Sequence, residues 1–282
     1  MILPLTAAAR ALLPVRFGHR PPLYSPQFPF LLLWSHKAAS TALAQWFFAQ
    51  IGSPQLRNGD PDAARRYAGL GIHGYQFDVH CRGALYRFHC RRALAGALPV
   101  IRFVRDPAAR AYSAFLATRR AVVREQPGFW GAKVSRQVLA FKGLADPSAG
   151  YSFADFVDWL GATPTQAQDP HVRQQWMGFE PGRRIECVPI EDLAARLGEL
   201  EQRFGLPPVS ARPEIFRSGH HRPPPLRVEP PLLASLLEDP VPPGCFDHAP
   251  APAVDSALLA GTGLGARLRS GLRADYLACP IY

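Results

Sequence analysis

The stretch Phe30-Leu-Leu-Leu-Trp-Ser-His-Lys-Ala-Ala-Ser-Thr-Ala-Leu-Ala-Gln-Trp-Phe48 decides the fold. It opens with an unbroken apolar run over residues 30–34, which is typical of a strand buried on both faces, as in a parallel sheet. A short polar segment follows, and beyond it apolar residues recur at the spacing of a helix. The stretch therefore predicts a strand, a tight turn and a helix, the unit from which α/β folds are built.

The turn of this unit carries five polar residues, Ser35, His36, Lys37, Ser40 and Thr41. A turn between a strand and a helix directs the N–H groups of the helix N-terminus toward one point, where they can bind an anion. Lys37 adds a positive charge, and the hydroxyl groups add donors. No glycine is present, so the segment is not a Walker A loop. We call residues 35–41 the anion loop and expect it to bind a phosphate or a similar group; an ordinary capped turn is the alternative.

Two further apolar runs lead into helical patterns. Together the three runs predict a central, mainly parallel sheet with helices on both faces and strands over residues 30–34, 99–104 and 184–189. Prolines interrupt the first part of the chain, so residues 1–27 are expected to form an irregular lead-in. Residues 28–282 are expected to form a single α/β domain.

The second run continues into Arg105-Asp-Pro-Ala-Ala-Arg-Ala-Tyr-Ser113. Asp106 is predicted to cap a helix that begins at Pro107. Arg105 ends the strand and Ser113 lies about two turns into the helix, so both could meet one bound anion. The alternative is a surface arginine beside a capped helix. Ligands of open α/β sheets bind at the carboxyl ends of the strands, where both segments are expected to lie.

The composition limits the class of partner. The chain of 282 residues has a formal net charge of +10, which favours an acidic partner. Its basic residues are spread along the chain and form no nucleic-acid-binding motif, so we expect no nucleic-acid partner. The five cysteines are odd in number and form no C-x-x-C pair, which favours a reducing compartment, and no spacing matches a metal site. No apolar run is long enough to span a membrane.

The two anion-binding segments resemble those of sulfotransferases that use 3′-phosphoadenosine 5′-phosphosulfate (PAPS), and most closely the carbohydrate sulfotransferases of the family 2 type. In that family a Pro-Lys pair, small residues and then Ser or Thr hold the 5′-phosphosulfate. His36 stands here where the family usually has proline. The family's 3′-phosphate motif is a strand ending in Arg-Asp-Pro, then Arg, then Ser, and it is matched by Arg105, Arg110 and Ser113.

Weaker matches extend the resemblance intermittently from about residue 28 to residue 282. The segment Asp169-Pro-His-Val-Arg-Gln-Gln-Trp176 resembles the Asp-x-His-x-x-x-Gln segment of carbohydrate sulfotransferases. Asp275-Tyr276 and the final Tyr282 resemble the family's terminal Asp-Tyr…Tyr signature. A loop with anion-binding character, Ser218-Gly-His-His-Arg222, lies between them.

The resemblance implies a P-loop-NTPase-like three-layer domain that moves the sulfuryl group of PAPS to an acceptor hydroxyl, most often on a carbohydrate, without a metal. Lys37 would stabilise the leaving oxygen, and a histidine would take the hydroxyl proton. His80 and His73 precede the Arg105 strand, as the family's base histidine does; His36 and His171 are further candidates. The implied cofactor-binding residues are His36, Lys37, Ala38, Ala39, Ser40, Thr41, Arg105 and Ser113.

Eukaryotic carbohydrate sulfotransferases carry an N-terminal membrane anchor, and no such segment is apparent here. We therefore expect a bacterial, cytoplasmic protein without stable membrane insertion. Two other classes stay open. One is a nucleotide-dependent kinase of related P-loop-like fold, which the missing glycines disfavour. The other is a non-catalytic protein that binds a nucleotide or an acidic glycan. The sequence predicts neither the acceptor, nor the strand order, nor the oligomeric state.

Overall fold

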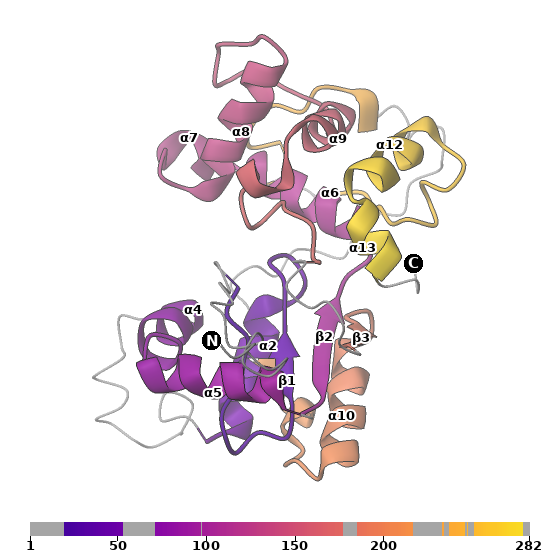
Figure 1. Cartoon of the computed structure of the whole chain (residues 1–282). Coiled ribbons are helices and arrows are strands. Elements are labelled where there is room, and N and C mark those ends of the chain that lie inside the picture. Colours follow the sequence, from indigo (N-terminus) through magenta and orange to yellow (C-terminus); the bar gives the residue numbers. More distant parts are fainter. Residues whose placement is uncertain are drawn as a thin grey trace, which may run out of the picture. The chain divides into compact units, whose positions relative to one another are not determined.

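The computed structural model describes residues 20–52, 71–96, 98–176, 185–216, 233, 237–245, 247 and 251–278. Residues 1–104 and 177–219 form one compact unit, and residues 105–176 and 220–282 form a second (Figure 1). This division does not decide whether residues 28–282 make one domain, which stays a prediction. The loop predicted at residues 218–222, Tyr282 and most of the lead-in lie outside the described residues.

A parallel sheet organises the first unit. Its strands are β1 (Leu31–Leu33), β2 (Val100–Val104) and β3 (Ile185–Pro189), in the order β1-β2-β3. Both pairings are parallel, with Leu33 opposite Arg102 in the first. The three predicted strands and the α/β class are therefore confirmed, and the strands of the first two apolar runs are neighbours.

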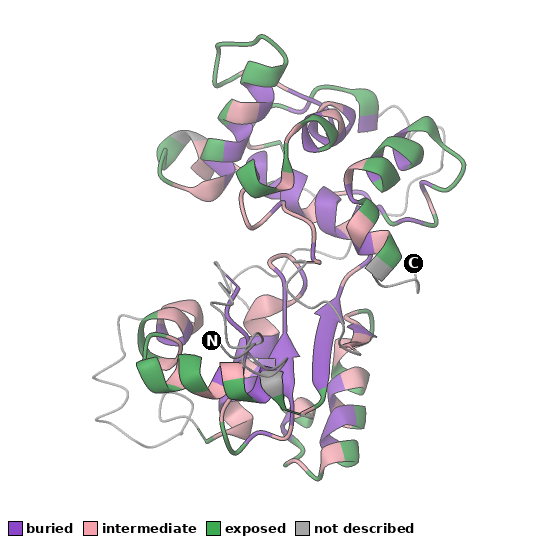
Figure 2. Ribbon diagram, viewed as in Figure 1, coloured by how far each residue is buried: buried purple, intermediate pink, exposed green. Residues whose placement is uncertain are grey.

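Helices pack on both faces of this sheet, which explains why β1 is apolar without interruption. On one face, Leu32 belongs to a core with α2 (Ser40–Gln50) and α10 (Leu193–Phe204). On the other face, Leu31 and Leu33 pack with α5 (Ala84–Ala95). All three residues of β1 are buried (Figure 2).

The end of the lead-in is built into this unit. Leu23 pairs antiparallel with Leu32, on the side of β1 that β2 does not occupy. The indole Nε1 of Trp34 donates a hydrogen bond of 2.8 Å to the carbonyl of Pro21. Residues 20–27 therefore pack against β1, although they form no helix or continuous strand.

Between α2 and α5 the described chain forms a short helix, α4 (Ile72–Gly74), which continues into a π-helical segment, η2 (Tyr75–His80). A π-helix is a rare conformation that is frequently found at functional sites. Two of the candidate histidines, His73 and His80, lie on these two elements.

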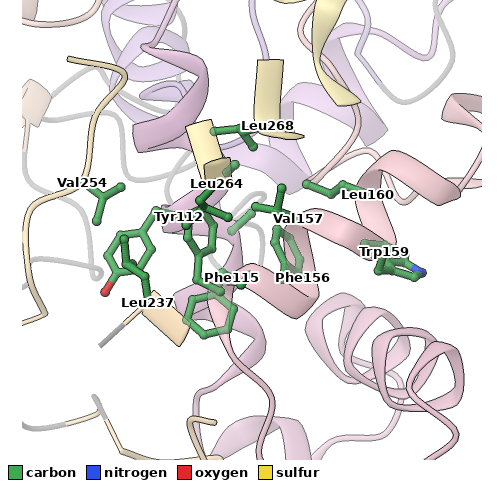
Figure 3. Close-up of a cluster of buried hydrophobic side chains, with 14 of the residues drawn as sticks. Tyr112, Phe115, Phe156, Val157, Trp159, Leu160, Leu237, Val254, Leu264 and Leu268 are labelled. Carbon is green, nitrogen blue, oxygen red and sulfur yellow. The ribbon is translucent and has the colours of Figure 1, made fainter. Parts of the chain in front are cut away.

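The second unit is helical in its described part. It contains α6 (Pro107–Thr118), α7 (Val122–Glu125), α8 (Trp130–Phe141), α9 (Phe153–Ala162), α12 (Gly263–Gly271) and α13 (Arg273–Ala278). Its core joins residues far apart in the chain: Tyr112 and Phe115 of α6 pack in one cluster with Phe156 of α9 and Leu268 of α12 (Figure 3). These residues are apolar and recur at helical spacing within each element, so each helix buries one face.

Two findings bear on the expected compartment. Among the described residues, Cys81, Cys90 and Cys245 carry free thiols, whereas Cys187 is disulfide-bonded. This disulfide differs from what the odd number of cysteines favoured, which was a reducing compartment. No described helix combines the length and the apolar character needed to cross a bilayer.

Candidate functional site

The backbone of the anion loop is strained. The loop follows β1 and leads into α2, and within it Lys37 and Ala39 have φ angles of 65° and 53°. These angles are left-handed, which side chains other than glycine disfavour, and such residues cost about 1–3 kcal/mol each. Asp192 is the one other non-glycine residue with positive φ among those described. Strain of this kind clusters at ligand-binding sites, and here two of the three instances fall in one loop.

The N-terminus of α2 has no side-chain cap among the described residues. Ala39 occupies the N-cap position and makes no capping hydrogen bond, and the hydroxyl of Thr41 lies against His73. The first turn also contains no acidic residue. The partial positive charge of this helix end is therefore not neutralised by the helix's own first turn. A helix N-terminus that lacks a side-chain cap leaves N–H groups that can bind an anion.

Ser35 supplies a second, independent sign of a ligand. Its side chain is 1% exposed, and its Oγ has no hydrogen-bond partner in the described part of the chain. A buried hydroxyl without a partner costs about 1–3 kcal/mol. Ala38 in the same loop is fully buried, so a larger side chain would need space that the loop lacks. A bound oxyanion would satisfy the Ser35 hydroxyl.

A chain of hydrogen bonds links the loop to a histidine. The Nε2 atom of His73 lies 3.0 Å from the hydroxyl of Thr41, and its Nδ1 lies 3.2 Å from Oε1 of Gln76. With the Gln76 amide oriented so that its oxygen faces the ring, that oxygen can only accept, which assigns the proton to Nδ1 and lets Nε2 accept from Thr41. Burial lowers the pKa of His73, although the bond to Gln76 opposes the shift. The imidazole is therefore neutral at neutral pH and presents a basic nitrogen to the loop.

The structure gives His80 a different environment. Its Nε2–H donates to the carbonyl of Tyr24 over 2.9 Å. Its ring makes edge contacts with the rings of Phe47, Phe48 and Tyr86. Burial lowers the pKa of His80, and the bond to the Tyr24 carbonyl opposes this. His80 therefore joins the lead-in to the core, whereas His73 contacts the anion loop.

His36 and His171 are the other candidate histidines. His36 lies in the anion loop, with its ring at 5.0 Å from that of Trp34 in an edge contact. His171 belongs to the second unit, where its ring stacks on Trp130 at 4.2 Å and an angle of 5°. Its Nδ1 lies 2.8 Å from Asp169. Burial would raise the pKa of Asp169, but the hydrogen bonds from the ring and backbone of His171 outweigh it, so this pKa is lowered.

The second predicted anion segment opens α6. Asp106 caps this helix as predicted, since its Oδ1 accepts from the N–H of Ala109 over 2.7 Å. Along residues 105–118 nearly every side chain is buried, and the exceptions are Arg105, Ala109 and Ser113. Ala109 and Ser113 are four residues apart and share one side of α6, whereas Arg105 lies two residues before the helix begins. Arg105 and Ser113 are thus both partly exposed, with the small Ala109 between them in the sequence.

Gln175 fixes the backbone of Arg105. Its Oε1 accepts from the N–H of Arg105 over 2.9 Å, and its Nε2 donates to the carbonyl of Arg105 over 2.8 Å. The amide of Gln175 thereby bonds both the N–H and the carbonyl of Arg105, as the backbone of a neighbouring strand would. Gln175 is the glutamine of the Asp-x-His-x-x-x-Gln resemblance, so that segment lies against the arginine of the other motif.

Arg110 and Asp275 hold this segment in turn. Arg110 is fully buried and donates to the carbonyls of Val172 and Arg173, while its Nη2 lies 3.7 Å from Oδ2 of Asp275. Oδ1 of Asp275 accepts from the N–H groups of Gln175 and Trp176. Burial lowers the pKa of Arg110, and the charge of Asp275 raises it. Arg110 therefore supports the segment from within the second unit, whereas Arg105 and Ser113 are accessible.

Sequence reasoning missed several of these partners. Gln76 gave one usable signal, because it lies three residues after His73 on a helical segment, where the two side chains can meet. The roles of Gln175 and Asp275 toward Arg105 and Arg110 left no local signal. Among the described residues, no group of three or more His, Cys, Asp or Glu side chains could hold a metal ion.

Comparisons of the chain with models of protein families, with curated proteins and with solved structures found no match. The site must therefore be interpreted from its own residues.

Proposed function

We propose that this protein is a PAPS-dependent sulfotransferase that moves the sulfuryl group to a hydroxyl of an acceptor, most simply a carbohydrate. The proposal includes the finer fold assignment, a P-loop-NTPase-like three-layer domain. The anion loop is the observation that carries it: a strained turn before an uncapped helix, with Lys37 in the turn and a neutral His73 bound to Thr41. A basic nitrogen beside the loop is what a transfer reaction needs to take up the proton of the acceptor hydroxyl.

The anion loop would bind the 5′-phosphosulfate. The backbone N–H groups at the start of α2 and the buried hydroxyl of Ser35 provide donors for oxygen atoms. Lys37 would lie at the oxygen between sulfur and phosphorus, where negative charge grows as the S–O bond breaks. An ammonium group suits this role because it is a compact charge on a flexible stem.

His73 would take the proton of the acceptor hydroxyl on Nε2. The acceptor oxygen forms a bond to sulfur, the bond from sulfur to the 5′-phosphate oxygen breaks, and the electron pair stays on that phosphate. Gln76 holds the tautomer that leaves Nε2 basic. Thr41 would release this nitrogen when the acceptor arrives, and its hydroxyl could then turn to the phosphosulfate. We choose His73 over His80 because Nε2 of His80 is protonated toward Tyr24.

Arg105 and Ser113 would bind the 3′-phosphate. Both are partly exposed, Arg105 just before α6 and Ser113 within it, and the small Ala109 between them leaves room for a ligand. Gln175 fixes the backbone of Arg105 so that fewer conformations are lost on binding. This second contact would distinguish PAPS from nucleotides that lack a 3′-phosphate.

Calorimetry with three nucleotides tests this assignment. We expect PAPS to bind more tightly than adenosine 5′-phosphosulfate, which lacks the 3′-phosphate, and than ATP. Arg105→Ala should weaken PAPS binding by about tenfold to a hundredfold, the equivalent of about 1.5–3 kcal/mol for a charge-assisted contact. It should leave the affinity for adenosine 5′-phosphosulfate nearly unchanged, because that ligand never meets Arg105.

Three outcomes would count against the proposal. Preference for ATP over PAPS would favour a kinase. An equal loss of affinity for both sulfated nucleotides in Arg105→Ala would mean that Arg105 supports the fold instead. Tight PAPS binding without any sulfate transfer, and without PAPS hydrolysis in the absence of acceptor, would indicate a non-catalytic binding protein.

A further inference from the structure

Helix α5 presents large apolar side chains to solvent. One side of the helix packs on the sheet through Cys90, Ala93 and Leu94. On the opposite side, Leu85 is 73% exposed and Phe88 is 57% exposed. The two residues are three positions apart, so they lie side by side on one face. Exposure of single apolar residues is common, but two adjacent large ones on one helix face indicate a contact surface.

Arginines lie beside these two side chains, since Arg82 is three residues before Leu85 and Arg91 and Arg92 are three and four residues after Phe88. Arg82, Arg87, Arg91 and Arg92 lie on or directly before α5, and none forms an ion pair with a residue that the structure describes. The sequence contains no Asp or Glu anywhere from residue 79 to residue 105. The positive charge of this face is therefore not compensated along its own segment, and Figure 2 shows exposed residues along the helix.

We propose that the solvent-facing side of α5 binds the surface of an anionic lipid bilayer. Leu85 and Phe88 would enter the boundary between headgroups and acyl chains, and the arginines would lie at the lipid phosphates. The helix would rest on the bilayer without crossing it. The inference is independent of the proposed function, since none of these residues belongs to the anion loop or to residues 105–113.

Other occupants fit this face less well. A nucleic acid would bind the arginines but would gain nothing from an exposed leucine. A second copy of the chain would meet this face with the same face in a two-fold dimer, which would bring arginines against arginines. An anionic bilayer satisfies both the apolar and the charged side chains.

Sedimentation of the full chain with lipid vesicles tests the proposal. The vesicles contain either phosphatidylcholine alone or phosphatidylcholine with about one third phosphatidylglycerol. We expect binding to the anionic vesicles and little to the neutral ones, with binding weakened when salt rises from about 0.1 M to about 0.5 M. The double variant Leu85→Ser/Phe88→Ser should lower the partition coefficient at least about tenfold.

A matched control distinguishes binding by this face from non-specific adsorption through any exposed apolar side chain. Phe141 and Leu277 are also a phenylalanine and a leucine, 51% and 69% exposed, but Phe141 ends α8 and Leu277 lies on α13. Phe141→Ser/Leu277→Ser should bind vesicles like the unchanged chain. Since all four side chains are exposed, both variants should keep the urea midpoint of the unchanged chain, which confirms that they fold.

Several results would overturn the proposal. These are equal binding to neutral and anionic vesicles, no binding to either, and an equal loss in the control variant. A dimer seen by light scattering that Leu85→Ser/Phe88→Ser abolishes would assign the face to a second copy. Binding of single-stranded DNA that the same variant leaves unchanged, without vesicle binding, would assign the arginines to a nucleic acid.

Discussion

Replacing His73 and His80 in turn tests which histidine is the base. Glutamine is the informative substitute at residue 73, because its amide can still accept from Thr41 but cannot take up a proton. If His73 is the base, His73→Gln should lower the rate of sulfate transfer by about 10²–10⁴-fold, the usual contribution of a general base. Affinity for PAPS should change much less, because the acceptor proton moves only in the transition state.

His80→Gln is the matched control, and its effect should fall on stability. The ring of His80 has three aromatic neighbours, Phe47, Phe48 and Tyr86, with ring centroids at 5.4, 5.2 and 5.3 Å. Each edge contact contributes about 0.5–1.5 kcal/mol beyond the burial of area, and the glutamine stem retains part of it, so a loss of about 2 kcal/mol is expected. The glutamine amide can still donate to the Tyr24 carbonyl.

The assays are urea unfolding and the rate of sulfate transfer, or of acceptor-free PAPS hydrolysis while no acceptor is known. Rates are compared at a temperature at which both variants are folded. An unchanged rate in His73→Gln would refute the assignment of the base. A rate in His80→Gln that falls as far as that of His73→Gln would show that the contact with Thr41 does not select the catalytic histidine.

The pH dependence gives a second readout of the same residues. Burial lowers the pKa of both His73 and His80 below the usual value of 6.5. A lowered pKa means that the unfolded chain binds protons that the folded chain does not, so stability is full above pH 6.5 and is lost as pH falls below it. The rate should likewise fall on the acid side with an apparent pKa below 6.5. In His73→Gln that limb of the rate profile should disappear, while His80→Gln should retain it.

Three further predictions concern other parts of the chain. Lys37→Ala should lower turnover far more than PAPS affinity, and Lys37→Arg should also be poor, whereas equal rates in all three proteins would exclude Lys37 from catalysis. Gln175→Ala should weaken PAPS binding severalfold, because the backbone of Arg105 would lose the two hydrogen bonds that hold it. Gln174→Ala is the control, and equal affinities of the two variants by calorimetry would mean that these bonds do not affect PAPS binding. Ser152→Ala removes the capping box of α9 and should lower the free energy of unfolding by about 0.5–2 kcal/mol, and an unchanged urea midpoint would contradict this.

Local features of the sequence determined the elements of the fold. Apolar runs fix where a chain can be buried on both faces, so all three strands could be predicted within about a residue or two. Asp106 and the capping box at Ser152 fix helix starts, because each bond joins residues three positions apart. The anion loop could be located in the same way, since it requires only a strand, a turn and a helix in succession.

The partners within the site were decided by the tertiary structure alone. His73 and His80 lie in one segment that precedes the Arg105 strand, and the sequence left both open as the base. The fold sets His73 against Thr41, 32 residues away, and turns His80 toward Tyr24, 56 residues away. Such contacts depend on how helices pack on the sheet, which no local pattern carries.

Contacts between residues still farther apart in the sequence organise the second unit. Gln175 reaches Arg105 across 70 residues, and Asp275 reaches Gln175 across 100. The sequence around Gln175 and Asp275 does not indicate which residues their side chains bond. Their roles follow from the buried environment around Arg110, where each polar group needs a hydrogen bond and the nearest available group comes from a distant segment.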